Sequence, residues 1–445
     1  MGELNQRVLM AAQNPHDTSH GGLAPPHQKR LLKVVRRGAA RALYPFYLHP
    51  LIAFGGIWLL IWLLYSLHLS QLILYPGSNV LSFDGVLLTT FVAGGALAYL
   101  LPPRFRMPAR WRLPNDTRTL ELLDRRLKLW FRIWCGITVL EVIYSGGIPM
   151  LWLLTGNSKT YMDFGIPTIH GFMNSMLLAI CLVRLSMALR YGRKEDLLLP
   201  AWAIFWSIIV ITRQLMMVFL LEAAVAYCTY RRIQTRRALN AGLSLLGLVY
   251  IFGVLGDLRS GAEGFRALAQ PTSTYPDWLP SGFLWFYMYL STPINNLLYT
   301  FHTTQPLYDW QFPNTLSQLL PTVLRNVFFT ADQLGTVNGD LVTSAFNVST
   351  AFAGPFQDFG IAGVVLFVFF ISLLSCLYWQ KRTFRDRLCY AVLCQCLLLT
   401  VFYNHFVLLP VITQLIWIYI FFYRTEGDVL VSDPARHRTA RPHAA

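Results

Sequence analysis

The sequence predicts an all-α, polytopic helical membrane protein with about ten membrane spans and one large segment outside the membrane. Of the 445 residues, 55% are hydrophobic and only 13% are charged. The apolar runs recur along nearly the whole chain and are separated by short connections rich in Lys and Arg. Such connections mark the cytoplasmic side of a membrane protein. The net charge of +15 therefore indicates topology and not a nucleic-acid partner.

Residues 1–47 are predicted to form a cytoplasmic basic tail, because a polar sequence with several Lys and Arg precedes the first apolar run. Spans at 51–69 and 85–101 would then form a hairpin. The hairpin leads into a strongly basic loop at 104–128. Both ends of the hairpin are therefore expected inside.

The third and fourth spans, at 129–145 and 166–185, carry polar residues toward their outer ends. Glu141 would be costly against lipid, so it either faces a wet cavity or a cation, or lies solvated at the interface. His170 and Asn174 are one helical turn apart and share a face. That face either lines a site or holds a hydrogen-bonded core histidine.

The apolar run 197–230 predicts two shortened helices with a turn between them. Basic residues flank it on both sides, so the chain must cross an even number of times. About 34 residues are too few for two helices of about 20 each. Arg213 falls at the midpoint, where we expect a wet, protein-lined pocket. The alternative is one long tilted helix in which Arg213 pairs with a carboxylate such as Glu141.

After seven spans within 48–256, residues 257–360 are predicted to form one large periplasmic loop. Its apolar stretch 283–301 contains a proline and two asparagines and is rich in Tyr and Trp. We therefore expect an interfacial helix there and not a span.

Spans eight to ten are predicted within 361–424. The last two share the run 388–423 around Asn404 and His405, and both ends of that run are basic. Residues 425–445 would be a second cytoplasmic tail, so both termini are expected in the cytoplasm.

Cations are scarce on the predicted outer side. The large loop contains three arginines, Arg259, Arg266 and Arg325, and no lysine. Together with Arg213 and Lys159 they are the available anion binders. Guanidinium groups match phosphate oxygens and stay charged when desolvated, so a few of them would suit a lipid-linked diphosphate. Arg266 is interpreted as a solvated surface residue.

Transfer of a sugar to a hydroxyl needs a proton acceptor, and a carboxylate or an imidazole can serve. The candidates in the outer segment are Asp257, Asp332, Asp340, Asp358 and His302. Asp358 has a rival role, because it directly precedes a span and could cap the N-terminus of that helix.

The predicted catalytic residues are Arg213, Arg259, His302 and Asp358. Residues expected to bind substrate have cationic, aromatic or amide side chains suited to a charged, hydroxyl-rich ligand: Arg325, Lys159, Tyr161, His170, Tyr289, Asn295 and Asn347. No Asp-x-Asp, P-loop or Cys/His metal spacing occurs, so we expect neither a metal nor a cofactor. All seven cysteines lie in apolar segments, which argues against a disulfide-bonded outer domain.

In several ordered stretches the chain resembles the bacterial oligosaccharide repeat-unit polymerases, the Wzy-type O-antigen polymerase family. These stretches are Arg213 with its turn and the segments 161–174, 256–261, 286–297, 346–352 and 358–363. The resemblance implies a fold like that of the C-type membrane glycosyltransferases. It also implies a metal-independent enzyme that moves a growing glycan from undecaprenyl pyrophosphate onto the next lipid-linked repeat unit.

The resemblance further implies an inner-membrane protein with a periplasmic active face. Its expected partners are undecaprenyl-pyrophosphate-linked oligosaccharide, the lipid bilayer, and chain-length regulator and flippase proteins. O-antigen ligases share the plan, so ligase is the near alternative. A flippase or transporter for a lipid-linked glycan is the alternative from another class, although we would expect it to show two related halves.

Overall fold

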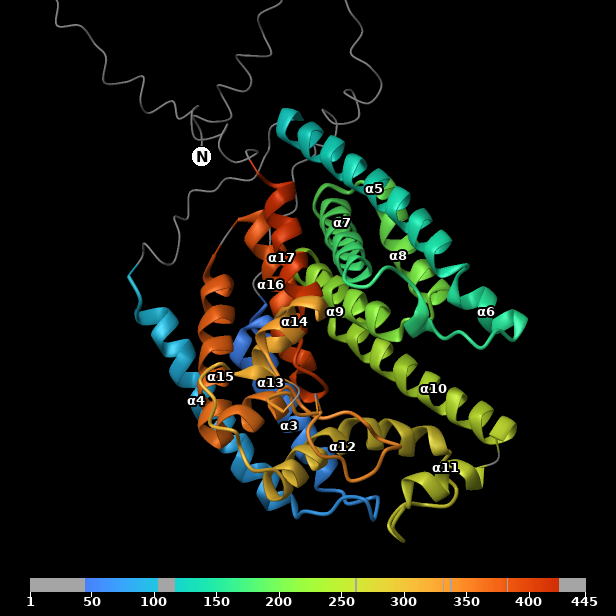
Figure 1. The fold of residues 1–445 in the computed structure, drawn as a ribbon, viewed down its shortest axis with the longest axis vertical. Helices are drawn as coiled ribbons and strands as arrows, with labels where there is room; N and C mark the ends of the chain where they lie inside the picture. Colours follow the sequence, from blue (N-terminus) through green and yellow to red (C-terminus); the bar gives the residue numbers. More distant parts are fainter. Residues whose placement is uncertain are drawn as a thin grey trace, which may run out of the picture.

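The structure, a computed structural model, describes residues 45–102, 117–260, 262–330, 332–336, 338–381 and 383–423. The predicted cytoplasmic tails lie almost entirely outside the described residues, as does part of the first basic loop. Within them the regular structure is helical (Figure 1), and the one strand-like pairing is an isolated bridge between Ser70 and Pro271. The predicted all-α class is confirmed.

The α-helices follow one another with short connections up to the outer segment. They are α3 (Pro50–Tyr65), α4 (Gly77–Leu100), α5 (Thr117–Ser145), α6 (Pro149–Thr155), α7 (Ile169–Tyr191), α8 (Leu198–Ile209), α9 (Arg213–Tyr230), α10 (Thr235–Ser260), α11 (Ala262–Ala269), α12 (Ser281–Thr303), α13 (Pro313–Leu316), α14 (Thr322–Phe328), α15 (Ala353–Gln380), α16 (Phe384–Leu398) and α17 (Leu409–Phe421).

Four helical stretches are long and apolar enough to cross a membrane: Gly77–Leu100, Thr119–Thr155, Ile169–Tyr191 and Ala353–Gln380. Shorter apolar helices occur at Pro50–Tyr65, Ala238–Ile251 and Leu409–Phe421. A membrane-embedded helical protein is therefore supported, while the count of about ten spans stays a prediction.

The tightest helix pair is α4 with α15. Gly94 faces the backbone of α15 so closely that a Cβ there would lie 2.4 Å from the Phe369 carbonyl oxygen. The Ser372 hydroxyl donates to the Phe91 carbonyl oxygen across the same contact. Small residues let two helix backbones approach in this way within a membrane. On its other side α4 packs on α3, where the Phe54 and Phe91 rings stack at 4.3 Å.

Helix α7 lies at the centre of a group of helices formed with α5, α8, α9 and α17. In its apolar window 78% of the residues are buried, by α5, α8, α9 and α17. At its C-terminal end Arg190 lies over the Phe384 ring, which also contacts Tyr230 and Phe422. The C-terminal ends of α7, α9 and α17 therefore meet the start of α16. We call this the Phe384 end of the bundle.

Buried ion pairs fix α5 to α7 near the Phe384 end. Arg184 donates to Asp124 and to Asp196 at 2.5 and 2.8 Å, and all three side chains are nearly inaccessible. Arg193 joins the same network through Asp196 at 3.0 Å. Charges this deeply buried are tolerated only when paired. The network therefore holds α5, α7 and the turn after α7 together.

Two predicted helix pairs are confirmed as broken helices. Helices α8 and α9 are separated by Val210 to Thr212, so the alternative of one long tilted helix is wrong. Helices α16 and α17 are likewise separated by short 3₁₀ turns between Leu399 and Val407. Breaks of this kind occur at membrane depth only where protein or a cavity covers the freed backbone groups.

Helix α10 runs to Ser260, past Gly256, so its last turn belongs to the predicted outer segment 257–360. Helix α10 extends away from α9 toward α11 and α12 (Figure 1). The apolar stretch predicted to be an interfacial helix is indeed helical as α12. Most residues of α12 are buried inside the protein, and its place relative to the membrane stays a prediction.

Candidate functional site

Two helix breaks lie at the end of the bundle opposite Phe384. The first break is residues 210–212, between α8 and α9, and the second break is residues 399–408, between α16 and α17. Because the C-terminal ends of α9 and α17 both reach Phe384, the two helices run in the same direction and their N-termini share the other end. The buried Gln414 Nε2 of α17 donates to the buried Glu222 carboxylate of α9 at 2.8 Å, which ties the helices together midway.

Arg213 is the first residue of α9, directly after the first break. Ile211 has φ of 56°, and the Thr212 N–H donates to the Ser207 carbonyl oxygen, so the turn is tight. The Arg213 side chain is exposed and makes no hydrogen bond or ion pair within the described chain. Its charge adds to the partial positive charge of the helix N-terminus. The alternative in which Arg213 pairs with Glu141 is not seen, because the described contact of Glu141 is with His170.

The second break holds polar groups and receives an arginine from the outer segment. His405 is 2% exposed and its Nδ1 lies 3.3 Å from Gln395 Nε2. Both polar side-chain atoms of Asn404 are buried without a partner in the described chain. Arg325 of α14 lies close enough to Tyr403 to interact electrostatically, and its Nε donates to a carbonyl oxygen at 3.1 Å. Arg325 is thus placed beside the second break.

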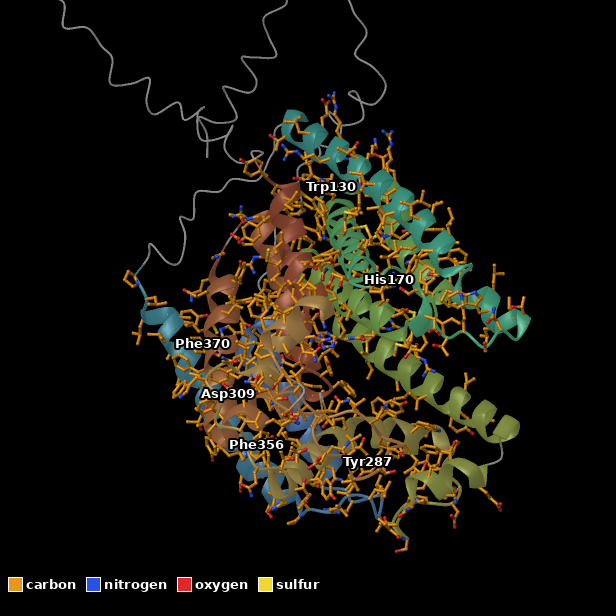
Figure 2. The ribbon with its side chains drawn as sticks, in the orientation of Figure 1. Trp130, His170, Tyr287, Asp309, Phe356 and Phe370 are labelled. Carbon is orange, nitrogen blue, oxygen red and sulfur yellow. The ribbon has the colours of Figure 1, made fainter. Side chains whose placement is uncertain are left out.

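A carboxylate, an imidazole and an amide form a hydrogen-bonded series where the C-terminal part of α5 meets the N-terminal part of α7. Glu141 is 1% exposed, and its Oε2 lies 3.2 Å from His170 Nδ1. Asn174 Nδ2 lies 2.9 Å from His170 Nε2. Because an amide nitrogen only donates, Nε2 is the acceptor and Nδ1 carries the proton. Glu141, Phe164, His170 and Asn174 are called the Glu141 corner below; Figure 2 labels His170 among them.

The Glu141 corner adjoins the first break. The Phe164 ring contacts His170 at 5.3 Å and Trp206 at 6.2 Å, and Trp206 belongs to the last turn of α8. Gly165, with φ of 93°, lets the loop lie directly against the imidazole, since a Cβ there would come within 2.5 Å of it. Phe164 therefore links His170 to the last turn of α8, the helix that ends just before the first break.

The loop between α6 and α7 holds two predicted binding residues. Lys159 Nζ donates to the Ser145 carbonyl oxygen at 2.7 Å and lies over the Trp152 ring. Tyr161 is exposed at the start of a short 3₁₀ turn. The backbone N–H and hydroxyl of Thr160 donate to Asp163, which lowers the pKa of that carboxyl below its usual range. The turn next to Tyr161 is thereby held in one conformation.

Asp358 acts as a helix cap, although not on the helix that the sequence indicates. Its carboxylate accepts from the backbone N–H groups of Asn314 and Thr315 at 2.8 and 2.7 Å, at the start of α13. A third bond comes from the Asn314 side chain. Asp358 is fully buried. With its oxygens engaged in this way, it ties the outer segment to α15.

The predicted residues of α12 lie apart from the breaks. Asn295 Oδ1 accepts from the Tyr65 hydroxyl and the Leu74 N–H, so this amide joins α12 to the α3–α4 connection. His302 is exposed and stacks on Tyr75 at 4.9 Å. Tyr289 is 47% exposed and stacks on Trp285.

Asn347 is exposed, and its carbonyl oxygen accepts from Asn338. Arg259 lies in the last turn of α10, and its side chain lies outside the described residues. No hydrogen bond or ion pair joins any two of Arg213, His302 and Asp358 in the described chain. Among the predicted binding residues, Lys159 and His170 are linked through rings, because Lys159 lies over Trp152 and the Phe164 ring contacts both Trp152 and His170. Arg325 lies apart from them, at the second break.

Sequence reasoning missed the contact between Glu222 and Gln414. A carboxylate in the middle of an apolar run is itself a signal of a functional or interhelical role. Among the described residues, no group of three His, Cys, Asp or Glu is close enough to hold a metal ion.

Comparison with known proteins gives no match: no protein-family model, curated protein or solved structure is significantly similar to this chain.

Proposed function

We propose that this protein is a membrane glycosyltransferase that polymerises undecaprenyl-pyrophosphate-linked oligosaccharide repeat units without a metal. The observation that carries the proposal is Arg213, an exposed guanidinium at the N-terminus of α9 that no other described residue pairs with. An arginine in that setting needs an anion, and a lipid diphosphate supplies one at membrane depth.

The diphosphate would be the leaving group of the transfer. Arg213 and the N-terminus of α9 would stabilise the charge that develops on it as the glycosidic C–O bond breaks. Arg325 adds a second guanidinium at the neighbouring break. Fixed positive groups of this kind replace a metal ion in the proposed reaction.

The proton of the attacking sugar hydroxyl would pass to His170. Glu141 holds Nδ1–H, so Nε2 has the free electron pair, and the substrate hydroxyl takes the place of Asn174 beside it. The carboxylate of Glu141 then stabilises the imidazolium that forms, as in other carboxylate–histidine pairs. His170 is favoured over the predicted bases because Asp358 is occupied as a cap and His302 stacks on Tyr75.

The proposed orientation puts the Phe384 end in the cytoplasm and the two breaks toward the periplasm. Arg190, Arg193, Arg231 and Arg385 lie at or near the Phe384 end, in accordance with the positive-inside rule. The proposed location is the bacterial inner membrane, with both termini in the cytoplasm. Chain-length regulator and flippase proteins are its proposed partners.

The experiment compares glycan ladders from cells that carry Arg213→Ala, Arg213→Lys or Arg266→Ala. Arg266→Ala is the matched control, because Arg266 pairs with the exposed Asp277 on the surface and such pairs contribute little. We expect Arg213→Ala to leave a single repeat unit on the lipid acceptor, Arg213→Lys to shorten the ladder, and the control to be normal.

A normal ladder from Arg213→Ala, with the protein present in the membrane, would end the catalytic proposal. Loss of every capped product, including the single unit, would favour the ligase or the flippase. One gel therefore separates the polymerase from the other two functions.

A further inference from the structure

An exposed group of aromatic rings lies where the outer segment crosses α15. The rings of Tyr308, Trp310 and Phe312 surround Phe359, with centroids 6.0, 4.7 and 5.0 Å from its own. Trp310 is 80% exposed and Tyr308 is 66% exposed. We call these four residues the aromatic platform. Tryptophan is usually well covered in folded proteins, so such open rings indicate an interaction surface.

The platform is held in position by the backbone beneath it. Tyr308 and Phe312 have φ of 55° and 49°, a left-handed conformation that bulky side chains rarely adopt. The Leu307 N–H donates to the Gln357 carbonyl oxygen at 2.8 Å, and Pro306 packs on Gly360 at the kink of α15. The rings are therefore presented in a fixed arrangement and not on a free loop.

Polar groups with defined orientation stand between the rings. Asp309 Oδ1 accepts from the Gln311 N–H at 2.8 Å, and Oδ2 accepts from Gln333 Nε2 at 2.9 Å. A carboxylate has about four acceptor positions, so Asp309 can accept from further hydroxyl groups. A ring face for the C–H side of a sugar and a fixed acceptor for its hydroxyls together suit a pyranose.

Charge favours a glycan over a lipid surface as the occupant. The Asp309 carboxylate stands between the rings, where it would repel anionic lipid headgroups but accept hydrogen bonds from sugar hydroxyls. Residues 304–321 contain Asp309 and no Lys or Arg. The platform is therefore suited to a neutral, hydroxyl-rich partner.

We propose that the aromatic platform binds one sugar ring of the growing glycan and retains the chain between additions. This inference rests on the proposed function, since it names a second glycan contact of the same enzyme. The contact is separate from the Glu141 corner, because Asp309 lies across the bundle from His170 (Figure 2). It predicts an effect on chain length with the first linkage left intact.

The test compares Trp310→Ala with Trp278→Ala. Trp278 is 81% exposed and belongs to the same outer segment, so it is the matched control. We expect Trp310→Ala to shift the glycan ladder to shorter chains while the first addition persists, and Trp278→Ala to give a normal ladder. Titration of the purified protein with delipidated glycan from the same cells should show affinity about tenfold lower for Trp310→Ala only.

The outcomes separate the platform from the proposed function. Equal ladders and equal affinities for the two tryptophan variants would refute the platform, even if Arg213→Ala abolishes polymerisation. If Arg213→Ala leaves the ladder unchanged, the transfer function fails while the titration still decides whether the platform binds glycan. Quenching of Trp310 fluorescence by brominated lipid, lost in Trp310→Phe, would show that the ring inserts into the bilayer and would overturn the proposal.

Discussion

At the scale of single residues, the buried carboxylates Glu141 and Glu222 differ in their hydrogen-bond partners, and the partner indicates which of them could support proton transfer. Glu222 accepts from an amide, Gln414, so its carboxylate meets no group that can take up a proton at neutral pH. The Glu141 carboxylate lies instead beside the His170 imidazole, whose Nε2 has a free electron pair that can accept a proton. One oxygen of each carboxylate, Glu141 Oε1 and Glu222 Oε1, is buried without a partner in the described chain, so the two residues differ only in the group that the other oxygen meets.

Replacing Glu141 with Gln tests whether it positions and supports His170. We expect transfer to fall about tenfold or more, because the amide cannot stabilise the imidazolium charge and the general base supplies about 10²–10⁴-fold of rate. Thermal stability in detergent should be unchanged or higher, since a buried carboxylate with a free oxygen is removed.

The measurement pairs the glycan ladder with a melting curve for each variant. A purely structural Glu141 would give the opposite pattern, with stability and activity falling together in Glu141→Gln. Glu141→Asp, which keeps the charge, should recover part of the activity.

At the scale of elements, close backbone approach determines how α4 and α15 pack. Both helices are apolar all round, so within lipid the hydrophobic effect does not choose the face at which they meet. Gly94 and Gly95 on α4 face Ser372 and Cys376 on α15, which makes this face the one with the smallest separation. The small residues on this face, which allow the two backbones to approach closely, therefore determine which sides of α4 and α15 pack together.

Gly94→Ala should therefore destabilise the protein, and Gly85→Ala should not. A Cβ at Gly94 would lie 2.4 Å from the Phe369 carbonyl oxygen and 3.0 Å from the Ser372 Cβ, whereas one at Gly85, on the same helix, meets nothing within 4 Å. Overpacking of this kind costs about 1–3 kcal/mol. The alanine at position 85 should instead add helix propensity of up to about 1 kcal/mol.

Thermal unfolding in detergent, followed by near-ultraviolet circular dichroism, gives the comparison. Equal melting temperatures for Gly94→Ala and the natural chain would mean that the α4–α15 contact is looser than the structure has it.

At the scale of the whole molecule, the outer segment is attached to the bundle by side chains and not by a continuous sheet or disulfides. Asn295 joins α12 to the α3–α4 connection, and Asn296 donates to the carbonyl oxygens of Phe346 and Val348. Asp358 caps α13. These ties bring Arg325 to the second break while α12 remains buried, and so the segment forms part of the bundle.

Reporter fusions at Phe301 and Lys381 test the topology of the whole chain. We expect Phe301 on the periplasmic side and Lys381 in the cytoplasm, because α15 alone crosses between them and Lys381 follows at the basic end. A reporter active only in the cytoplasm and one active only outside it would be attached at each position. Both positions on one side would require another number of crossings.

The sequence by itself determined the features that depend on local pattern. Hydrophobicity and the placement of Lys and Arg predicted a helical membrane protein, and the length of 197–230 predicted a break at Arg213, because neither property needs a distant partner. His170 and Asn174 were placed on one face by their spacing for the same reason.

Only the tertiary structure decided which residues meet. The pairing of Glu141 with His170, the use of Asp358 as a cap for α13, and the position of Arg325 beside Tyr403 each join segments separated by tens of residues or more. Asn295 looked like a substrate ligand from its amide, yet its partners are Tyr65, Leu72 and Leu74. The chemical type of each side chain can be read from the sequence. Its partners depend on how the helices pack, and packing between distant segments leaves no local sequence pattern.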